Sequence, residues 1–274
     1  MLSSPADTPL SDSATISSSN PARAQAIRTR KNGPPVAALT AYDYPTGRLL
    51  DESGIDLILV GDSLGMVVYG HPDTTSVTLA DMVRHTQAVR RGVRQACLVA
   101  DLPAGTYLTP SQALASARDL VAAGADAVKL EGGLAILPQI ELILAKGIPV
   151  VGHLGMLPQH VVEEGGYRRK GKLPAEADAL LADAAALDQA GVSAIVLESI
   201  VASLADAITL SVRCPTIGIG SGPSTDGQIR VIHDLIGAFP WFRPPFAECY
   251  HDTSALVRDA AQRFRDSLTP PQPS

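Results

Sequence analysis

Short apolar runs alternate with longer segments of helical periodicity from residue 36 onward. The runs are almost continuously apolar, which is typical of strands buried on both faces of a parallel sheet. Seven runs stand out: Val36–Thr40, Leu57–Gly61, Cys97–Ala100, Ala127–Leu130, Pro149–Gly152, Ala194–Leu197 and Thr216–Ile219. We place an eighth strand near Val231–Ile236 or slightly later.

Helix start and stop signals separate these runs. Thr109 and Pro110 combine a capping hydroxyl with a proline at the first helical position, and Gly124 follows the same helix. Pro174 and Gly191 bracket an Ala- and Leu-rich helix in the same way. The alternation of strands and helices therefore predicts an α/β fold with a parallel sheet.

Two observations favour a closed (β/α)₈ TIM barrel over a doubly wound sheet. No G-x-G-x-x-G follows the first strand, and polar residues end nearly every strand instead of gathering at one switch point. A length of 274 residues is ordinary for one barrel. We expect a catalytic barrel over residues 25–268, disordered ends at 1–24 and 269–274, and a last helix near 253–267 that packs back on the barrel.

Composition narrows the classes of function. The net charge is −6 and the basic clusters are short, which argues against nucleic-acid binding. No apolar run approaches the ~20 residues that a membrane span needs, and the Ser-rich start has no secretory apolar stretch. Three scattered cysteines predict a reducing, cytoplasmic location. The basic cluster at 168–172 is either a solvated loop or an attraction site for an anionic substrate or polyglutamate-like tail.

Chemically competent side chains follow five successive predicted strands. They are Asp62 with Ser63, Asp101, Lys129 with Glu131, His153, and Glu198. In a barrel these strand ends converge on the mouth that holds the active site. A single carboxylate could be a helix N-cap, but four close together repel and need a cation or a shared proton. Oxygen ligands favour a hard ion such as Mg²⁺.

Individual roles are less constrained by the residues alone. Lys129 and Glu131 share one face of their strand. They could form a buried ion pair. We prefer the alternative in which Lys129 binds a substrate carboxylate and Glu131 lies in or beside the metal shell. Glu198 ends an apolar run that would raise its pKa, as a general base requires. His153 could be a base, a substrate contact or a core histidine. The glycine-rich turn at 218–222 could bind a phosphate through backbone N–H groups, or its glycines could only allow the backbone to pass close to its neighbours.

A specific series of motifs adds a family resemblance. The motifs are Thr40-Ala41-Tyr42-Asp43, Val60-Gly61-Asp62-Ser63-Leu64-Gly65-Met66, Val128-Lys129-Leu130-Glu131-Gly132-Gly133, Gly152-His153-Leu154-Gly155 with Pro158-Gln159, Gly165-Gly166-Tyr167, Leu197-Glu198, Gly218-Ile219-Gly220 and Asp226-Gly227-Gln228. From about Ala26 to about Tyr250 the chain resembles the ketopantoate hydroxymethyltransferases.

The resemblance implies a barrel of the phosphoenolpyruvate/pyruvate superfamily. It also implies that the protein is a homo-oligomer, often a decamer. It implies hydroxymethyl transfer from 5,10-methylenetetrahydrofolate to 3-methyl-2-oxobutanoate, which gives 2-dehydropantoate for pantothenate and coenzyme A. Asp62 and Asp101 would bind Mg²⁺ with Glu131 in the metal site, and Glu198 would accept the proton. The implied oxo-acid contacts are Asp62, Ser63, Asp101 and Lys129, with His153 as a further substrate or folate contact.

The chain departs from the family's pattern near its end. Where the family usually has a segment with further basic residues, this chain has residues 242–248. Arg230 occupies a position that is apolar in the family, and Ser221 stands where the family usually has an alanine. Two alternatives are another superfamily lyase or mutase acting on an oxo-acid, and a catalytically silent barrel. The first usually has a cysteine in a Lys-Lys-Cys-like loop, which this chain lacks, and the second predicts loss of a strand-end carboxylate.

Overall fold

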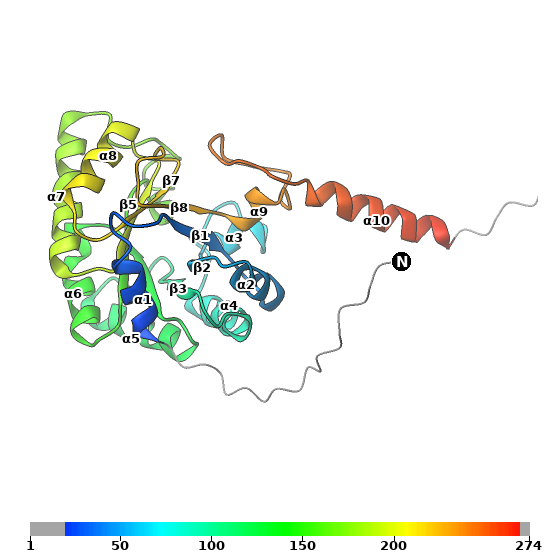
Figure 1. Cartoon of the computed structure of the whole chain (residues 1–274), viewed down its shortest axis with the longest axis horizontal. Coiled ribbons are helices and arrows are strands. Elements are labelled where there is room, and N and C mark those ends of the chain that lie inside the picture. The colour runs from blue at the N-terminus through cyan, green and yellow to red at the C-terminus, as the bar shows by residue number, and fades with distance from the viewer. Residues whose placement is uncertain (1–19, 269–274) are drawn as a thin grey trace, which may run out of the picture.

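Eight parallel strands close into a barrel in chain order, β1 to β8, with β8 paired to β1. The computed structural model describes residues 20–268. The strands are β1 (Val36–Thr40), β2 (Leu57–Val60), β3 (Cys97–Asp101), β4 (Ala127–Glu131), β5 (Val150–Gly155), β6 (Ala194–Glu198), β7 (Thr216–Ile219) and β8 (Gly227–Arg230). The predicted (β/α)₈ TIM barrel is confirmed, and Figure 1 shows its helices outside the strands.

Helices connect and cover the strands. The α-helices are α1 (Pro21–Arg28), α2 (Tyr44–Glu52), α3 (Leu64–Val67), α4 (Leu79–Gly92), α5 (Pro110–Ala122), α6 (Leu137–Ala145), α7 (Pro174–Ala190), α8 (Ala202–Ser211), α9 (Ile232–Leu235) and α10 (Thr253–Ser267), with 3₁₀ turns η1 (Leu134–Ile136) and η2 (Pro158–His160). Thr109 caps α5 by accepting a hydrogen bond from the Gln112 N–H, and Gly191 ends α7 at φ +98°. These caps confirm the helix signals in the sequence.

Apolar side chains on both faces of the strands explain the unbroken apolar runs. On β2, Leu57 and Leu59 point into the barrel, whereas Ile58 and Val60 pack against the helices. On β4, Val128 and Leu130 face the helices, which leaves Lys129 and Glu131 together on the inner face, as their shared face predicted. The inner face of β4 thus carries a buried polar pair.

The eighth strand was predicted too late in the chain. β8 is Gly227–Arg230, and residues 232–235 of the predicted strand form the short helix α9 instead. Gln228 and Arg230 alternate with buried Gly227 and Ile229 on β8, so the strand lacks the continuous apolar run of the others. The apolar residues that follow belong to a helix that buries Ile232.

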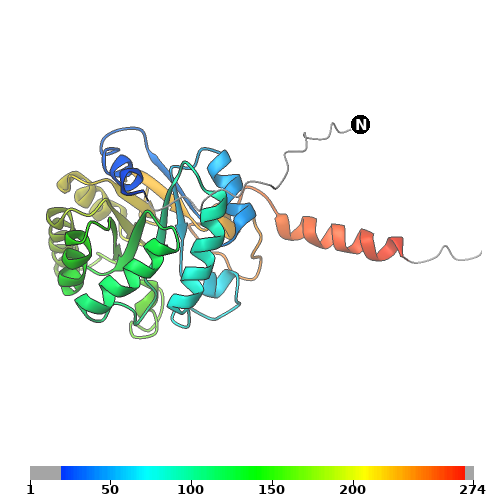
Figure 2. The ribbon, with the colours of Figure 1, turned by 90° about the horizontal axis from the view of Figure 1, so that it is seen from below.

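Two further expectations about the ends of the chain were wrong. Residues 21–24 are helical, because Asn20 accepts a hydrogen bond from the Ala22 N–H and begins α1; residues 1–19 and 269–274 lie outside the described part of the structure. The last helix has the predicted bounds, but α10 buries none of its residues and projects away from the barrel (Figures 1 and 2). Its apolar side chains therefore have no partner within the described part of the chain.

None of the helices between residues 20 and 268 is both long and apolar enough to cross a membrane.

Candidate active site

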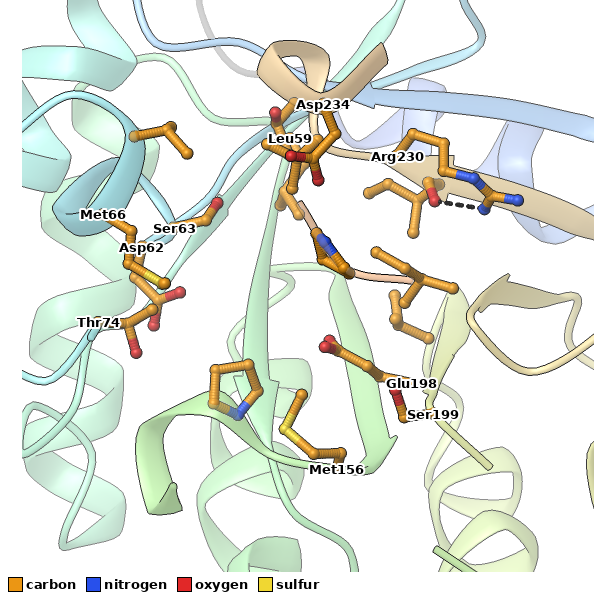
Figure 3. Close-up of a pocket in the computed structure, with 18 of the residues that line it drawn as sticks. Leu59, Asp62, Ser63, Met66, Thr74, Met156, Glu198, Ser199, Arg230 and Asp234 are labelled. Carbon is orange, nitrogen blue, oxygen red and sulfur yellow. Dashed lines mark hydrogen bonds between the residues drawn. The ribbon is translucent and has the colours of Figure 1, made fainter. Parts of the chain in front are cut away.

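The carboxyl ends of the strands surround a cavity of about 410 Å³. The predicted site residues all line it: Asp62, Ser63, Asp101, Lys129, Glu131, His153 and Glu198. Two cross-strand pairs fix their order, since Asp101 is level with Lys129 and Glu131 is level with His153. Figure 3 shows Asp62 and Glu198 entering the cavity from different sides, as expected for the ends of β2 and β6.

Asp62 and Asp101 form a buried pair of carboxyl groups. The Asp62 N–H donates to Oδ2 of Asp101 over 3.1 Å. Burial, together with repulsion from Asp101 and Glu131, raises the pKa of Asp62 well above its ordinary value. Burial also raises the pKa of Asp101, although Lys129 opposes this. The pair is therefore a place where negative charge is costly unless a cation is nearby.

Gly61 allows these groups to approach one another. A Cβ at this position would lie 2.9 Å from Oγ of Ser63 and 3.6 Å from Oδ2 of Asp101. The Ser63 hydroxyl also lies 2.8 Å from the Tyr42 hydroxyl, which orients it at the cavity wall. A side chain at residue 61 would push Ser63 out of this arrangement.

Lys129 is a buried cation beside the carboxyl pair. Its Nζ lies 2.9 Å from Oδ1 of Asp101. Burial by itself would lower the lysine pKa, but attraction to Asp101, Glu131 and Asp62 raises it above the ordinary value. Lys129 therefore remains an ammonium group inside the barrel mouth.

His153 lies between two carboxylates. Its Nδ1 is 3.2 Å from Oε1 of Glu131, and its Nε2 is 3.2 Å from Oε2 of Glu198. Burial and nearby Lys129 would lower the histidine pKa, but the two carboxylates raise it to about 9. For Glu131, burial opposes ionisation, yet contacts with His153 and Lys129 bring its pKa below the ordinary value. The Glu198 side chain is 15% exposed against 1% for Glu131, so Glu198 is the carboxylate that a ligand can reach.

The sequence did not assign a role to Gln159. This buried side chain donates from Nε2 to Oδ2 of Asp62 (2.7 Å) and to the Leu102 carbonyl (2.9 Å), and accepts at Oε1 from the Tyr107 hydroxyl (2.5 Å). Its N–H also donates to Oε2 of Glu131 over 3.0 Å. The Pro158-Gln159 motif on η2 was the available signal, but an amide carries no charge pattern that points to a partner on β2.

A largely apolar wall forms the outer part of the cavity. Phe239, Phe242 and Phe246 line it, so the 242–248 segment that departs from the family pattern covers this side of the mouth. Asp234 also lines the cavity, and no described residue donates a hydrogen bond to its carboxyl group. Burial raises the pKa of Asp234 to about 6, against some attraction to Arg243. Asp234 is a polar group of the site that the sequence analysis did not single out.

The glycine-rich turn at 218–222 has a visible packing role. The Ser221 hydroxyl donates to the Leu197 carbonyl over 2.7 Å and accepts from the Ile200 N–H over 3.0 Å. Gly220 lies under the Phe246 ring, where a Cβ would come within 2.8 Å of ring carbon Cδ1. Close backbone passage therefore accounts for this glycine, and phosphate binding stays a prediction.

The donor set can hold a hard cation through two carboxylates. Among residues 20–268 no group of three or more His, Cys, Asp or Glu side chains is arranged as a metal site. Mg²⁺, however, usually takes one or two carboxylates and completes its shell with water and substrate oxygens. Oδ1 of Asp101 is buried, and the Lys129 ammonium 2.9 Å away is its ion-pair partner. The Asp62–Asp101 pair thus fits such an ion.

Comparison with known proteins identifies the family. The sequence model of the family "Ketopantoate hydroxymethyltransferase" matches residues 22–271. The chain belongs to the ketopantoate hydroxymethyltransferase family. It is 49% identical to the 3-methyl-2-oxobutanoate hydroxymethyltransferase of Ignicoccus hospitalis, over 88% of this chain and 92% of that protein. It is 48% identical to the enzyme of the same name from Moorella thermoacetica, over 89% and 91%. The family resemblance is confirmed, and the chain is a member of a transferase family.

Solved structures agree on the fold of this family member. Phosphonopyruvate hydrolase, solved as a complex with oxalate and Mg²⁺, matches with a TM-score of 0.62 at 15% identity, over 91% of this chain and 92% of that one. 2,3-Dimethylmalate lyase, a member of the PEP mutase/isocitrate lyase superfamily, matches with a TM-score of 0.62 at 17% identity, over 92% and 90%. These matches agree with the (β/α)₈ barrel fold, and the superfamily type stays a prediction.

Proposed function

We propose that the protein transfers a hydroxymethyl group from 5,10-methylenetetrahydrofolate to 3-methyl-2-oxobutanoate, giving 2-dehydropantoate for pantothenate and coenzyme A synthesis. The names of the relatives support this reaction. The observation that carries the proposal is the placement of Asp62, Asp101 and Lys129 on one side of a cavity whose other side presents Glu198. This arrangement separates the groups that can bind a 2-oxo-acid from a group that can accept its proton.

Asp62 and Asp101 would hold Mg²⁺. Both oxygens of Glu131 already face donors, from His153 and the Gln159 N–H, so we place Glu131 beside the ion. When bound, the ion would withdraw electron density from the carboxylate and keto oxygens of the oxo-acid. A superfamily neighbour solved with oxalate and Mg²⁺ supports this pairing of ion and small oxo-anion.

Lys129 and Ser63 would orient the oxo-acid. The Lys129 ammonium is the buried cation nearest the carboxyl pair, and it can pair with the substrate carboxylate as a charge-assisted contact. The Ser63 hydroxyl, set by Tyr42, offers a further hydrogen bond at the same wall. Together with Asp62 and Asp101, these groups would hold C3 of the substrate toward Glu198.

Glu198 would accept the proton from C3. The C3–H bond breaks and its electron pair becomes the enolate, whose carbon bonds to the one-carbon unit as one carbon–nitrogen bond of the folate breaks. Water then supplies the hydroxyl oxygen as the second carbon–nitrogen bond breaks, which releases tetrahydrofolate. His153 lies 3.2 Å from Glu198, and both of its ring nitrogens face carboxylates. We therefore assign His153 to orienting Glu198 and not to direct contact with substrate or folate.

The outer wall would receive the folate. Aromatic side chains of Phe239, Phe242 and Phe246 suit stacking against flat rings. The Asp234 carboxyl group, which has no partner among the described residues, could accept hydrogen bonds from the N–H edge of a pterin. None of the three cysteines lines this cavity, which disfavours the lyase alternative that uses a catalytic cysteine.

We propose that the chain assembles into a homo-oligomer, a decamer by family resemblance. On α10, Leu256, Val257 and Phe264 are each more than 60% exposed and lie along one side of the helix. A second copy of the chain would bury this stripe. We also propose a cytoplasmic location, because Cys97, Cys214 and Cys249 are all free thiols.

Product formation tests the proposed function. The purified protein is incubated with 3-methyl-2-oxobutanoate, 5,10-methylenetetrahydrofolate and Mg²⁺, and 2-dehydropantoate is followed by NMR. We expect product that disappears with EDTA and returns with excess Mg²⁺. Cleavage of a dicarboxylic oxo-acid without hydroxymethyl transfer would instead support the lyase alternative.

A further inference from the structure

A second cavity, of about 420 Å³, opens beside the proposed catalytic cavity. Its lining residues are Arg169, Ile200, Ala202, Gly220, Gly222, Pro223, Gln228, Arg230 and Phe246. Arg230 and Phe246 line both cavities, so the two spaces meet at these side chains. A molecule too long for the first cavity can therefore continue into the second.

The second cavity carries positive charge that no neighbouring acid neutralises. Arg169 and Arg230 line it, and none of its lining residues is acidic. Elsewhere in the described chain, arginines commonly pair with carboxylates, as in Arg30–Asp56 and Arg90–Asp126. Arg169 and Arg230 have no carboxylate of the described residues within ion-pair distance.

Arg230 is held in place by neutral groups. Its Nη1 donates to Oε1 of Gln228 over 3.0 Å and to the Ile229 carbonyl over 2.8 Å, contacts that fix the guanidinium without cancelling its charge. In Figure 3 the Arg230 side chain lies at the edge of the catalytic cavity, near the end of β8. The remaining N–H groups are free to bind an anion in the planar geometry that suits a carboxylate.

Close packing positions Phe246 and the neighbouring turn where the two cavities meet. Phe246 lies over Gly220, which adopts φ +64°, and Gly222 at φ +86° leaves a Cβ only 2.9 Å from Cβ of Ala202. An aromatic group where the cavities meet would thus contact Phe246, with Arg230 at the same junction and Arg169 in the second cavity.

We propose that the second cavity binds the glutamate tail of the folate co-substrate, with Arg230 and Arg169 pairing with its carboxylates. The proposal rests on the proposed function and extends it to the part of the co-substrate distant from the reaction. A p-aminobenzoyl group would lie against Phe246, and the attached glutamate would reach Arg230 first. Each additional glutamate adds a carboxylate, so the cavity favours polyglutamate forms.

Fragment binding tests the inference without catalysis. Titration calorimetry compares p-aminobenzoyl-triglutamate and p-aminobenzoyl-monoglutamate on the native protein, Arg230→Gln, Arg169→Gln and the control Arg168→Gln. Arg168 is in the same loop but does not line the cavity, and its substitution changes the charge equally. We expect about tenfold weaker triglutamate binding for each of the first two variants and native binding for Arg168→Gln. An equal loss of triglutamate affinity in all three variants would show that only the net charge of the protein matters, and would overturn the proposal.

Kinetics separate this inference from the proposed function. The KM for methylenetetrahydrofolate triglutamate should rise about tenfold in Arg169→Gln, more than the KM for the monoglutamate, because Arg169 lines only the second cavity. Native product formation with no change in this ratio would refute the tail site and leave the reaction standing. Absence of product in the native protein would refute both. Arg230-dependent binding of inorganic phosphate that is tighter than that of the triglutamate fragment would assign the cavity to a phosphorylated ligand instead.

Discussion

Nε2 of His153 lies 3.2 Å from Oε2 of Glu198 and joins the fifth strand to the sixth at the mouth of the barrel. The opposite nitrogen of the same ring is 3.2 Å from Glu131, which is itself fixed by the Gln159 N–H. On its inner side the proposed base therefore contacts a buried chain made of His153, Glu131 and the Gln159 N–H.

Two substitutions of His153 should separate its contacts. The amide nitrogen of Asn can occupy the place of Nδ1, and that of Gln the place of Nε2, so His153→Gln retains a donor for Glu198 whereas His153→Asn does not. We expect C3–H exchange of the oxo-acid to fall about tenfold or more in His153→Asn, with a smaller fall in His153→Gln and little change in the KM for the oxo-acid. Equal rates in the two variants would show that the Glu198 contact is unimportant.

Gln159 should control metal affinity through Asp62. Gln159→Leu removes the 2.7 Å hydrogen bond to Oδ2 of Asp62 while keeping the size of the side chain similar. Loss of such a partner of a ligand typically weakens metal binding about 10- to 100-fold, and calorimetric titration with Mg²⁺ measures this. Gln112→Leu, in which the lost amide bonds only to the Gly105 carbonyl and the Leu108 N–H of a loop, is the control. Unchanged Mg²⁺ binding in Gln159→Leu would exclude Asp62 as a ligand oriented by this amide.

Asp234 should make stability depend on pH. Its folded pKa of about 6 exceeds the ordinary 3.8, so the folded protein keeps a proton that the unfolded chain releases between these values. The stability that the neutral carboxyl group contributes is fully present below pH 3.8 and is lost as the pH rises through about 6. Asp234→Asn should therefore be more stable than the native protein by roughly 1–2 kcal/mol at pH 8, after allowance for partial solvation, and no more stable at pH 4.

Urea unfolding at fixed protein concentration measures the Asp234 effect. Asp206→Asn, at an exposed position on α8, is the control for removal of a negative charge. A stability gain that is the same at both pH values, or is shared by the control, would contradict the shifted titration of Asp234.

The stripe on α10 should hold copies of the chain together. Leu256→Asp combined with Phe264→Asp places two charges on this exposed apolar face and should shift the sedimentation coefficient to that of a smaller species. Gln262→Asp adds a charge to another side of the same helix and should leave assembly intact. A native sedimentation profile for the double variant would show that α10 is not an interface.

The sequence could predict the barrel and its strand-end residues because parallel topology brings the ends of all strands to one mouth. Asp62, Asp101 and Glu198 therefore gather in one cavity although more than 130 positions separate the first from the last. The start of β8 was missed because Gln228 and Arg230 interrupt its apolar pattern.

Contacts between particular side chains could not be predicted from the sequence. The bond between Gln159 and Asp62 spans 97 positions, and no periodicity specifies which carboxylate an amide will meet. The apolar stripe of α10 predicted a buried face, but amphipathicity does not say whether the partner is the chain's own barrel or another molecule.

Proton exchange at C3 of 3-methyl-2-oxobutanoate tests the central assignment most directly. The protein is incubated with the oxo-acid and Mg²⁺ in D₂O without folate, and loss of the C3–H signal is followed by NMR. We predict Mg²⁺-dependent exchange in the native protein and a fall of at least ~100-fold in Glu198→Gln, with Mg²⁺ binding retained. Full exchange in Glu198→Gln would remove this residue from the role of base, and no exchange in the Mg²⁺-loaded native protein would contradict the proposed reaction itself.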